Sequence, residues 1–172
     1  MPNRKWIRIL TFLVCLIPLK VQAGCPPKLE PLVEQLLTAL PSYTNRIAQR
    51  RLGSQPLNTY LLTAGAANFD PLPLPQSQWR SPLTNTTRQV FFTTLERHYE
   101  QNSLHSQQNF YRAFFVETNQ GWQLALLYGQ LGATSESPVP QPPQDLSQGD
   151  VAQAIRLWLR DCGVSTSPQS PP

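Results

Sequence analysis

The segment NFYRAFFVETNQGWQLALLYGQL, residues 109–131, carries the clearest structural pattern in this chain. Two apolar, aromatic-rich runs, 109–117 and 122–131, flank Asn119-Gln120-Gly121, and Asn and Gly are typical of a tight turn between strands. The pattern predicts an antiparallel β-hairpin. Because both faces of this hairpin are apolar, we expect it to lie in the middle of a sheet, with cover on both sides.

Successive strand residues point to opposite faces, so alternation divides the side chains of the hairpin between its two faces. One expected face carries Phe110, Phe114, Val116, Trp122, Leu124, Leu126 and Tyr128. The other expected face carries Tyr111, Ala113, Phe115, Ala125 and Leu127.

Two segments upstream of the hairpin are expected to add strands to the same sheet. Residues 58–64, NTYLLTA, are apolar and β-prone. Residues 88–99, RQVFFTTLERHY, fit one side of a strand and also one face of a helix, and their threonines and aromatic residues favour the strand. The proline-rich residues between these segments have no apolar period and predict a long loop. Together with the hairpin, the two segments give about four antiparallel strands.

Helical apolar spacing flanks the strands at both ends of the chain. Residues 29–40 have one wide apolar face, and a second short helix is expected from Pro41 to Arg51, before Gly53, because proline interrupts the helical hydrogen bonds. The C-terminal helix is predicted from the spacing of Val151, Ile155, Trp158, Leu159 and Cys162. The predicted fold class is therefore α+β: an N-terminal helical segment, an antiparallel sheet, and a C-terminal helix packed back on the N-terminal one.

The N-terminus has the three parts of a secretory signal peptide. Arg4, Lys5 and Arg8 precede an apolar run at residues 9–19, and small residues near Ala23 mark a cleavage site. The apolar run is shorter than the roughly 20 residues that a membrane-spanning helix needs. The expected organisation is a signal peptide at 1–23, a single globular domain at 24–163 and a disordered Pro- and Ser-rich tail at 164–172.

Cleavage after Ala23 would change the charge of the chain. The full sequence has 14 Lys and Arg residues and 10 Asp and Glu residues, and four of the basic residues precede the cleavage site. The mature chain is then balanced, with a single lysine, Lys28, whereas a nucleic-acid partner would require a basic surface. We therefore expect no nucleic-acid partner. The signal peptide predicts a location in the periplasm, the extracellular space or a thylakoid lumen.

Two cysteines, Cys25 and Cys162, would remain after the signal peptide and its Cys15 are removed. An even number of cysteines in an exported chain predicts a disulfide, which here would join the start of the first helix to the last one. A bacterial lipoprotein also carries a cysteine just after its signal peptide, but its motif has an aliphatic residue where this chain has Gln22. The disulfide is favoured over a lipid anchor at Cys25, and no transmembrane anchor is expected.

Four blocks of the sequence resemble a family of small exported cyanobacterial proteins of unknown function. These blocks are LPSYTNRIAQR (40–50), VFFTTLER (90–97), GWQLAL (121–126) and QAIRLWLRDC (153–162). The resemblance extends over most of the mature chain and implies an exported, disulfide-bearing domain. None of the blocks is a catalytic signature, so the resemblance implies no activity.

Two groups of polar residues are candidate sites. Arg46 and Arg50 lie one helical turn apart with Arg51 adjacent, so their guanidinium groups could bind an anionic ligand or partner; the alternative is cations placed favourably at a helix C-terminus. On a strand, His98 would share one face with Glu96 and Glu100. These three side chains could form a metal or acid–base site, or they could simply be a solvated edge of the sheet.

The sequence contains none of the nucleophile or metalloprotease motifs G-x-S-x-G, S-x-x-K and H-E-x-x-H. A carboxylate pair such as Glu96 with Glu117 could flank a glycosidic bond if the two met in space. The expected function is a non-catalytic, exported, soluble binding module for an unknown protein or small ligand, without a cofactor or metal. The alternative is an extracytoplasmic hydrolase that uses carboxylates, with His98 as helper.

The signal peptide gives the first testable prediction. After export from a bacterial host, the intact mass of the purified protein should equal that of residues 24–172 less two hydrogen atoms, because Cys25 and Cys162 are oxidised. Mass spectrometry before and after reduction measures both features. A diacylglyceryl mass on Cys25 would contradict the prediction.

Overall fold

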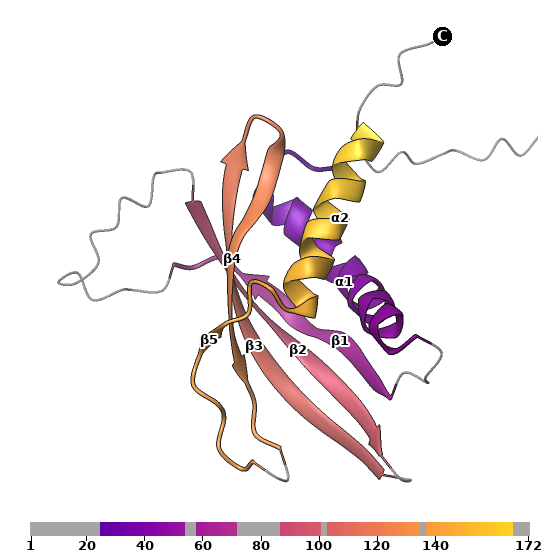
Figure 1. Cartoon of the computed structure of the whole chain (residues 1–172). Helices are drawn as coiled ribbons and strands as arrows, with labels where there is room; N and C mark the ends of the chain where they lie inside the picture. The colour runs from indigo at the N-terminus through magenta and orange to yellow at the C-terminus, as the bar shows by residue number, and fades with distance from the viewer. Residues whose placement is uncertain (1–24, 54–57, 72–86, 101–102, 135–136, 167–172) are drawn as a thin grey trace, which may run out of the picture.

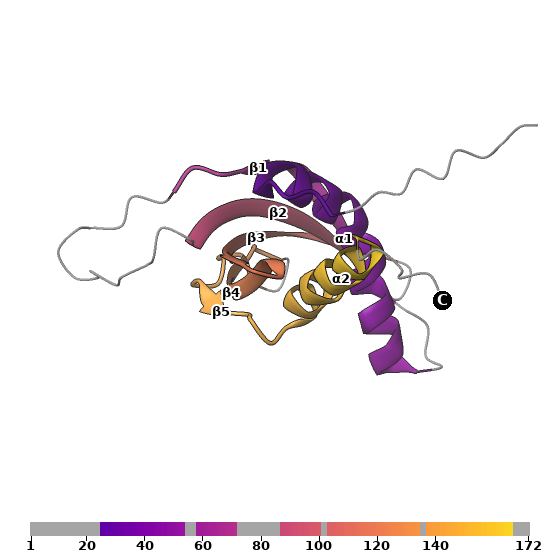
Figure 2. The same cartoon turned by 90° about the horizontal axis from the view of Figure 1, so that it is seen from above.

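The computed structural model describes residues 25–53, 58–71, 87–100, 103–134 and 137–166. Its elements are α1 (Leu29–Leu52), β1 (Thr59–Asn68), β2 (Thr87–Glu100), β3 (Ser103–Thr118), β4 (Gly121–Leu131), β5 (Gln144–Asp145) and α2 (Asp150–Thr166). The strands form one five-stranded antiparallel sheet in chain order, and both helices lie on the same side of it (Figures 1 and 2). The predicted α+β class and the packing of the terminal helices on each other are confirmed, with the two-residue β5 as an additional strand.

The β3–β4 hairpin is present, and its turn is closed at Thr118 and Gly121, which pair with each other. Gly121 has φ 101°, a left-handed conformation that favours glycine, and the Thr118 hydroxyl donates to its carbonyl at 2.7 Å.

The predicted assignment of side chains to the two faces of the hairpin is wrong at the start of β4. Phe115 pairs with Leu124 while Phe114 pairs with Leu126, so Ala125 forms a β-bulge that shifts the alternation by one residue. Leu124 therefore shares the face of Phe115 and not that of Phe114, and it is buried there.

The two faces of the sheet differ in their cover, which corrects the expectation that both are covered. The inner face, which faces the helices, buries Leu61, Val90, Phe92, Ala113, Phe115, Leu124 and Leu127. On the outer face, the side chains of Tyr60, Tyr99, Leu126 and Tyr128 are exposed, each by more than two-fifths. Hydrophobicity alone did not distinguish the faces, because soluble proteins also expose much apolar surface.

The α1 helix continues through Pro41, so the predicted break into two helices is wrong. Proline leaves one helical hydrogen bond unmade, at a cost of roughly 3 kcal/mol. The apolar stripe continues on both sides of Pro41, where Leu40 and Ile47 are buried, and this burial offsets the cost. The predicted glycine at the helix end is confirmed: Gly53 has φ 62°, and its N–H donates to the Gln49 carbonyl at 3.0 Å.

The ambiguous segment 88–99 lies entirely within strand β2, as its composition favoured. The β2–β3 pairing is continuous from Thr87 opposite Val116 to Glu100 opposite Ser103. At the C-terminus, α2 extends to Thr166, so residues 164–166 are helical although they were expected in the tail. The signal peptide, most of the expected loop (72–86) and residues 167–172 lie outside the described residues.

The terminal helices are joined by the Cys25–Cys162 disulfide, with 5.1 Å between the two Cα atoms. Two hydrogen bonds reinforce this end of the molecule. The Tyr43 hydroxyl donates to the Asp161 carboxylate at 3.1 Å, and the Trp122 indole N–H donates to the Pro27 carbonyl at 3.0 Å. The start of α1, the end of α2 and the β3–β4 hairpin are therefore held together.

The disulfide gives the second prediction. Its partners are 137 residues apart, and closing so long a loop stabilises the fold by about 4–5 kcal/mol at most in the chain-entropy treatment. We expect Cys25→Ser and Cys162→Ser each to lower Tm by about 10 °C. The double variant should lose no more than either single variant, because one bond is removed in all three. Thermal unfolding followed by circular dichroism tests this; additive losses would contradict it.

Candidate functional site

The inner face of the sheet changes from apolar to polar along β2 and β3. After Phe92 on β2 come Thr94 and Glu96 at alternate positions, and Asn109 lies opposite Thr94 on β3. Thr94 and Asn109 are fully buried, and Tyr111 beside them is 3% exposed. Burying polar groups costs free energy unless they find partners. Asn109 has a structural role, because its side-chain oxygen accepts a hydrogen bond from the Gly132 backbone N–H at 3.1 Å.

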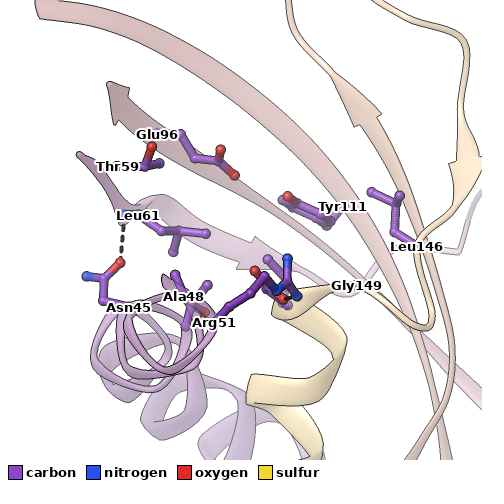
Figure 3. Close-up of a pocket in the computed structure, with 12 residues that line it drawn as sticks. Asn45, Ala48, Arg51, Thr59, Leu61, Glu96, Tyr111, Leu146 and Gly149 are labelled. Carbon is purple, nitrogen blue, oxygen red and sulfur yellow. Dashed lines mark hydrogen bonds and ion pairs between the residues drawn. The ribbon is translucent and has the colours of Figure 1, made fainter. Parts of the chain in front are cut away.

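A cavity of about 260 Å³ lies over Glu96 and Tyr111, between α1, the sheet and the start of α2. Figure 3 shows Glu96 and Tyr111 directed from β2 and β3 toward this space, with Asn45 and Arg51 approaching from α1. Asp150 and Val151 at the beginning of α2 complete the wall. Helices and strands that are distant in the sequence thus line the same cavity.

Side-chain hydrogen bonds hold the wall of the cavity in place. The Asn45 side-chain oxygen accepts a hydrogen bond from the Leu61 backbone N–H at 3.0 Å, which ties α1 to β1 (Figure 3). The Thr59 hydroxyl is 3.0 Å from His98 Nδ1, and His98 Nε2 is 3.7 Å from a Glu96 carboxylate oxygen. Glu96 is thereby oriented through His98 by the edge strand β1.

An ion pair between Arg51 and Asp150 joins the end of α1 to the first residue of α2. Its two members lie where the helix dipoles favour them, a cation at a C-terminus and an anion at an N-terminus. The other two arginines of the predicted cluster do not line the cavity. Arg46 stacks over the Tyr43 ring at 4.3 Å and donates to the Ser42 carbonyl, and Arg50 is exposed.

Burial raises the pKa of Glu96, and the charge of Asp150 raises it further, while Asn109 and His98 act in the opposite direction. Burial, and then the nearby Glu96, raises the pKa of Tyr111, so its phenol stays protonated at neutral pH. Thr44 Oγ1 is buried and forms no hydrogen bond with any described residue, so other atoms of Thr44 line the cavity.

Glu96 and His98 share one face of β2, as predicted, and their side chains are in contact. Of the two interpretations, the solvated edge does not describe Glu96, because Glu96 lines a cavity. Nothing is described of the Glu100 side chain. Glu117 does not meet Glu96, because Glu96 lies opposite Gln107, ten residues or about 33 Å along β3 from Glu117. Among the described residues, no group of three or more His, Cys, Asp or Glu side chains is placed to hold a metal ion.

Sequence reasoning missed Asn45, Thr59, Tyr111 and Asp150 as members of a site. One signal was available: Thr94 interrupts an apolar run in a segment that was expected to be a strand. Such an interruption indicates that a polar group lies in the core.

Comparison of the chain with models of protein families, with curated proteins and with solved structures finds no match in any of the three. In the described part of the chain, neither helix has the length and apolar character needed to cross a membrane. The fold and the site together define an α+β domain with a small, partly enclosed cavity between its sheet and its helices, largely apolar in its lining but containing Glu96, Asp150 and Arg51.

The shifted carboxyl group gives the third prediction. Because the pKa of Glu96 in the folded state lies above its ordinary value of 4.5, the folded state binds more protons than the unfolded state just above that pH. The stability contributed by Glu96 is therefore complete below pH 4.5 and is lost as the pH rises through the folded-state pKa. Glu96→Gln should leave Tm unchanged at low pH and raise it by a few degrees at neutral pH.

Thermal unfolding at a series of pH values measures this difference. Glu117→Gln is the matched control, because Glu117 is an exposed carboxylate on β3, far from Glu96. This variant should leave Tm unchanged at every pH. A Glu96→Gln variant that is less stable than the parent at neutral pH would show that the ionised carboxylate stabilises the fold, contrary to this prediction.

Proposed function

We propose that the mature chain is an exported, non-catalytic binding module that holds a small organic cation in the cavity between α1, the sheet and α2. The observation that carries the proposal is the carboxyl group of Glu96, which lines a cavity of about 260 Å³ while the one arginine of the described lining is paired with Asp150. Most other residues of this sheet face are apolar, so a carboxyl group at this position is a candidate functional group.

The charges of the cavity wall support a cationic ligand. The wall contains two carboxylates, Glu96 and Asp150, and one guanidinium group, Arg51, among its described residues. Arg51 and Asp150 form an ion pair with each other, which leaves Glu96 with the partial compensation of Asn109 and His98. An ammonium group has three hydrogen-bond donors, and the Glu96 carboxylate can accept from it. Its binding would also offset the cost of burying the Glu96 charge.

The size of the cavity supports a small ligand. Pockets that bind drug-sized molecules commonly have volumes of about 300–1,000 Å³. A cavity of about 260 Å³ lies below that range and suits an amine of a few carbon atoms. The Leu61 and Val151 side chains provide an apolar wall for such a chain.

Export is supported by two observations. Residues 1–23 have the pattern of a signal peptide, and the Cys25–Cys162 disulfide is typical of an oxidising compartment. Both accord with the proposed relation to small exported cyanobacterial proteins and with a place in the periplasm, the extracellular space or a thylakoid lumen. A lipid anchor at Cys25 would be incompatible with the disulfide.

A hydrolase that uses carboxylates is the second candidate. It is favoured by one observation: a carboxyl group with a raised pKa, Glu96, shares the cavity with a second acid, Asp150, as in acid–base pairs of hydrolases. However, Asp150 is engaged by Arg51, and His98 contacts Thr59 and Glu96 from outside the cavity lining. Binding without catalysis is therefore preferred.

The fourth prediction tests the cation site with n-butylammonium as the probe and n-butanol as its neutral counterpart. Butylammonium should raise Tm in a concentration-dependent manner, because it binds the folded state, and butanol should not. Glu96→Gln should weaken butylammonium binding at least about tenfold, as expected for loss of a charge-assisted hydrogen bond. Arg46→Ala, which removes an exposed arginine on α1, is the control and should bind as the parent does.

Thermal shift and isothermal titration calorimetry measure these effects. Equal binding of the alcohol, or binding that persists unchanged in Glu96→Gln, would refute a cation site at Glu96. Turnover of glycosidic or ester substrates that is abolished in Glu96→Gln would instead establish the hydrolase.

A further inference from the structure

The outer face of the sheet contains a second hollow, an aromatic groove of about 400 Å³, which shares only Tyr111 with the described lining of the Glu96 cavity. Its walls are formed by the rings of Phe91, Phe110, Phe114 and Tyr128, with Arg112 among them. We propose that this groove is a binding site for an aromatic carboxylate, whose ring packs against the aromatic walls while its anionic group binds the Arg112 guanidinium. The proposal does not depend on the ligand of the inner cavity.

Strand register brings the aromatic residues of the groove together. On β3, Phe110, Arg112 and Phe114 alternate on the outer face, and Arg112 lies opposite Phe91 on β2 and Tyr128 on β4. The Phe114 and Tyr128 rings meet edge to face, with centroids 6.1 Å apart. Tyr128 is 42% exposed, so part of this aromatic wall is open to a ligand. Aromatic rings arranged in this way suit a flat apolar ligand.

Arg112 is the only charged group among the described residues that line the groove. Its guanidinium lies over the Phe91 ring at 5.5 Å, and Nη1 donates to the Gln89 side-chain oxygen at 3.3 Å. Within the described part of the chain Arg112 forms no ion pair. A guanidinium has five N–H donors in a planar fork that matches a carboxylate, and stacking on Phe91 holds this fork in position before a ligand arrives.

The charge of the groove favours a small anion over a second copy of the chain. In a two-fold dimer formed through the groove, the Arg112 side chains of the two copies would lie close together. The described lining of the groove contains no Asp or Glu that could pair with either of them. Like charges at an interface oppose association, whereas an anionic ligand satisfies the same guanidinium.

The test uses 2-naphthoate as the probe and 2-naphthamide, of similar shape but neutral, as its counterpart. Isothermal titration calorimetry should show naphthoate binding at least about tenfold tighter than naphthamide, because only the carboxylate forms a charge-assisted pair with Arg112. Arg112→Ala should remove this difference, and Arg112→Lys should restore part of it, since lysine keeps the charge but not the fork. Arg97→Ala, which removes an exposed arginine of β2 outside the groove lining, is the matched control and should leave binding unchanged.

Two further measurements distinguish this groove from the inner cavity and from a dimer interface. Glu96→Gln should leave naphthoate binding unchanged, and Arg112→Ala should leave the butylammonium response unchanged. Naphthamide binding as tight as naphthoate, or naphthoate binding that survives Arg112→Ala in a variant with the parent's Tm, would overturn the proposal. So would a dimer in sedimentation experiments that becomes tighter on Arg112→Ala, because the groove would then be an interface between copies whose like charges had opposed each other.

Discussion

The register of the β2–β3 pairing is the constraint on which both proposed sites depend. The ladder runs without interruption from Thr87 opposite Val116 to Glu100 opposite Ser103. It directs Glu96 toward the helices and Arg112 toward the open face. Because side chains alternate along a strand, a slip of one residue would reverse the faces of one strand relative to the other. The hydrogen bonds that stabilise the sheet therefore also keep the carboxylate of the inner cavity and the guanidinium of the outer groove on opposite faces.

The helices determine which face of this sheet becomes enclosed. The disulfide joins the start of α1 to the end of α2, and the Arg51–Asp150 ion pair joins the end of α1 to the start of α2, so the two helices run antiparallel. The two links differ in strength. Arg51 is 64% exposed, and an exposed ion pair contributes about 0–1 kcal/mol, whereas a disulfide typically contributes about 2–4 kcal/mol. The covalent link thus supplies most of the restraint, while the ion pair borders the cavity and is the part that a ligand could perturb.

Local patterns in the sequence were enough to predict the hairpin, the terminal helices, the cysteine pairing and the shared strand face of Glu96 and His98. The failures have a common physical cause, which is that tertiary packing overrides local preference. Burial of Leu40 and Ile47 keeps α1 continuous at Pro41, and the bulge at Ala125 places Leu124 on the inner face. The cavity could not be predicted as a unit, because its polar residues belong to separate elements that only the tertiary fold brings together.

The central claim is that Glu96 is a largely buried carboxyl group kept for a cationic ligand, and its most direct test is titration of Glu96 followed by carbon NMR of the labelled side chain. We expect a pKa above the ordinary value of 4.5 in the free protein and a lower pKa when n-butylammonium is present, because a bound cation favours the ionised form. A pKa at or below 4.5 in the free protein, unchanged by the amine, would contradict this role of Glu96.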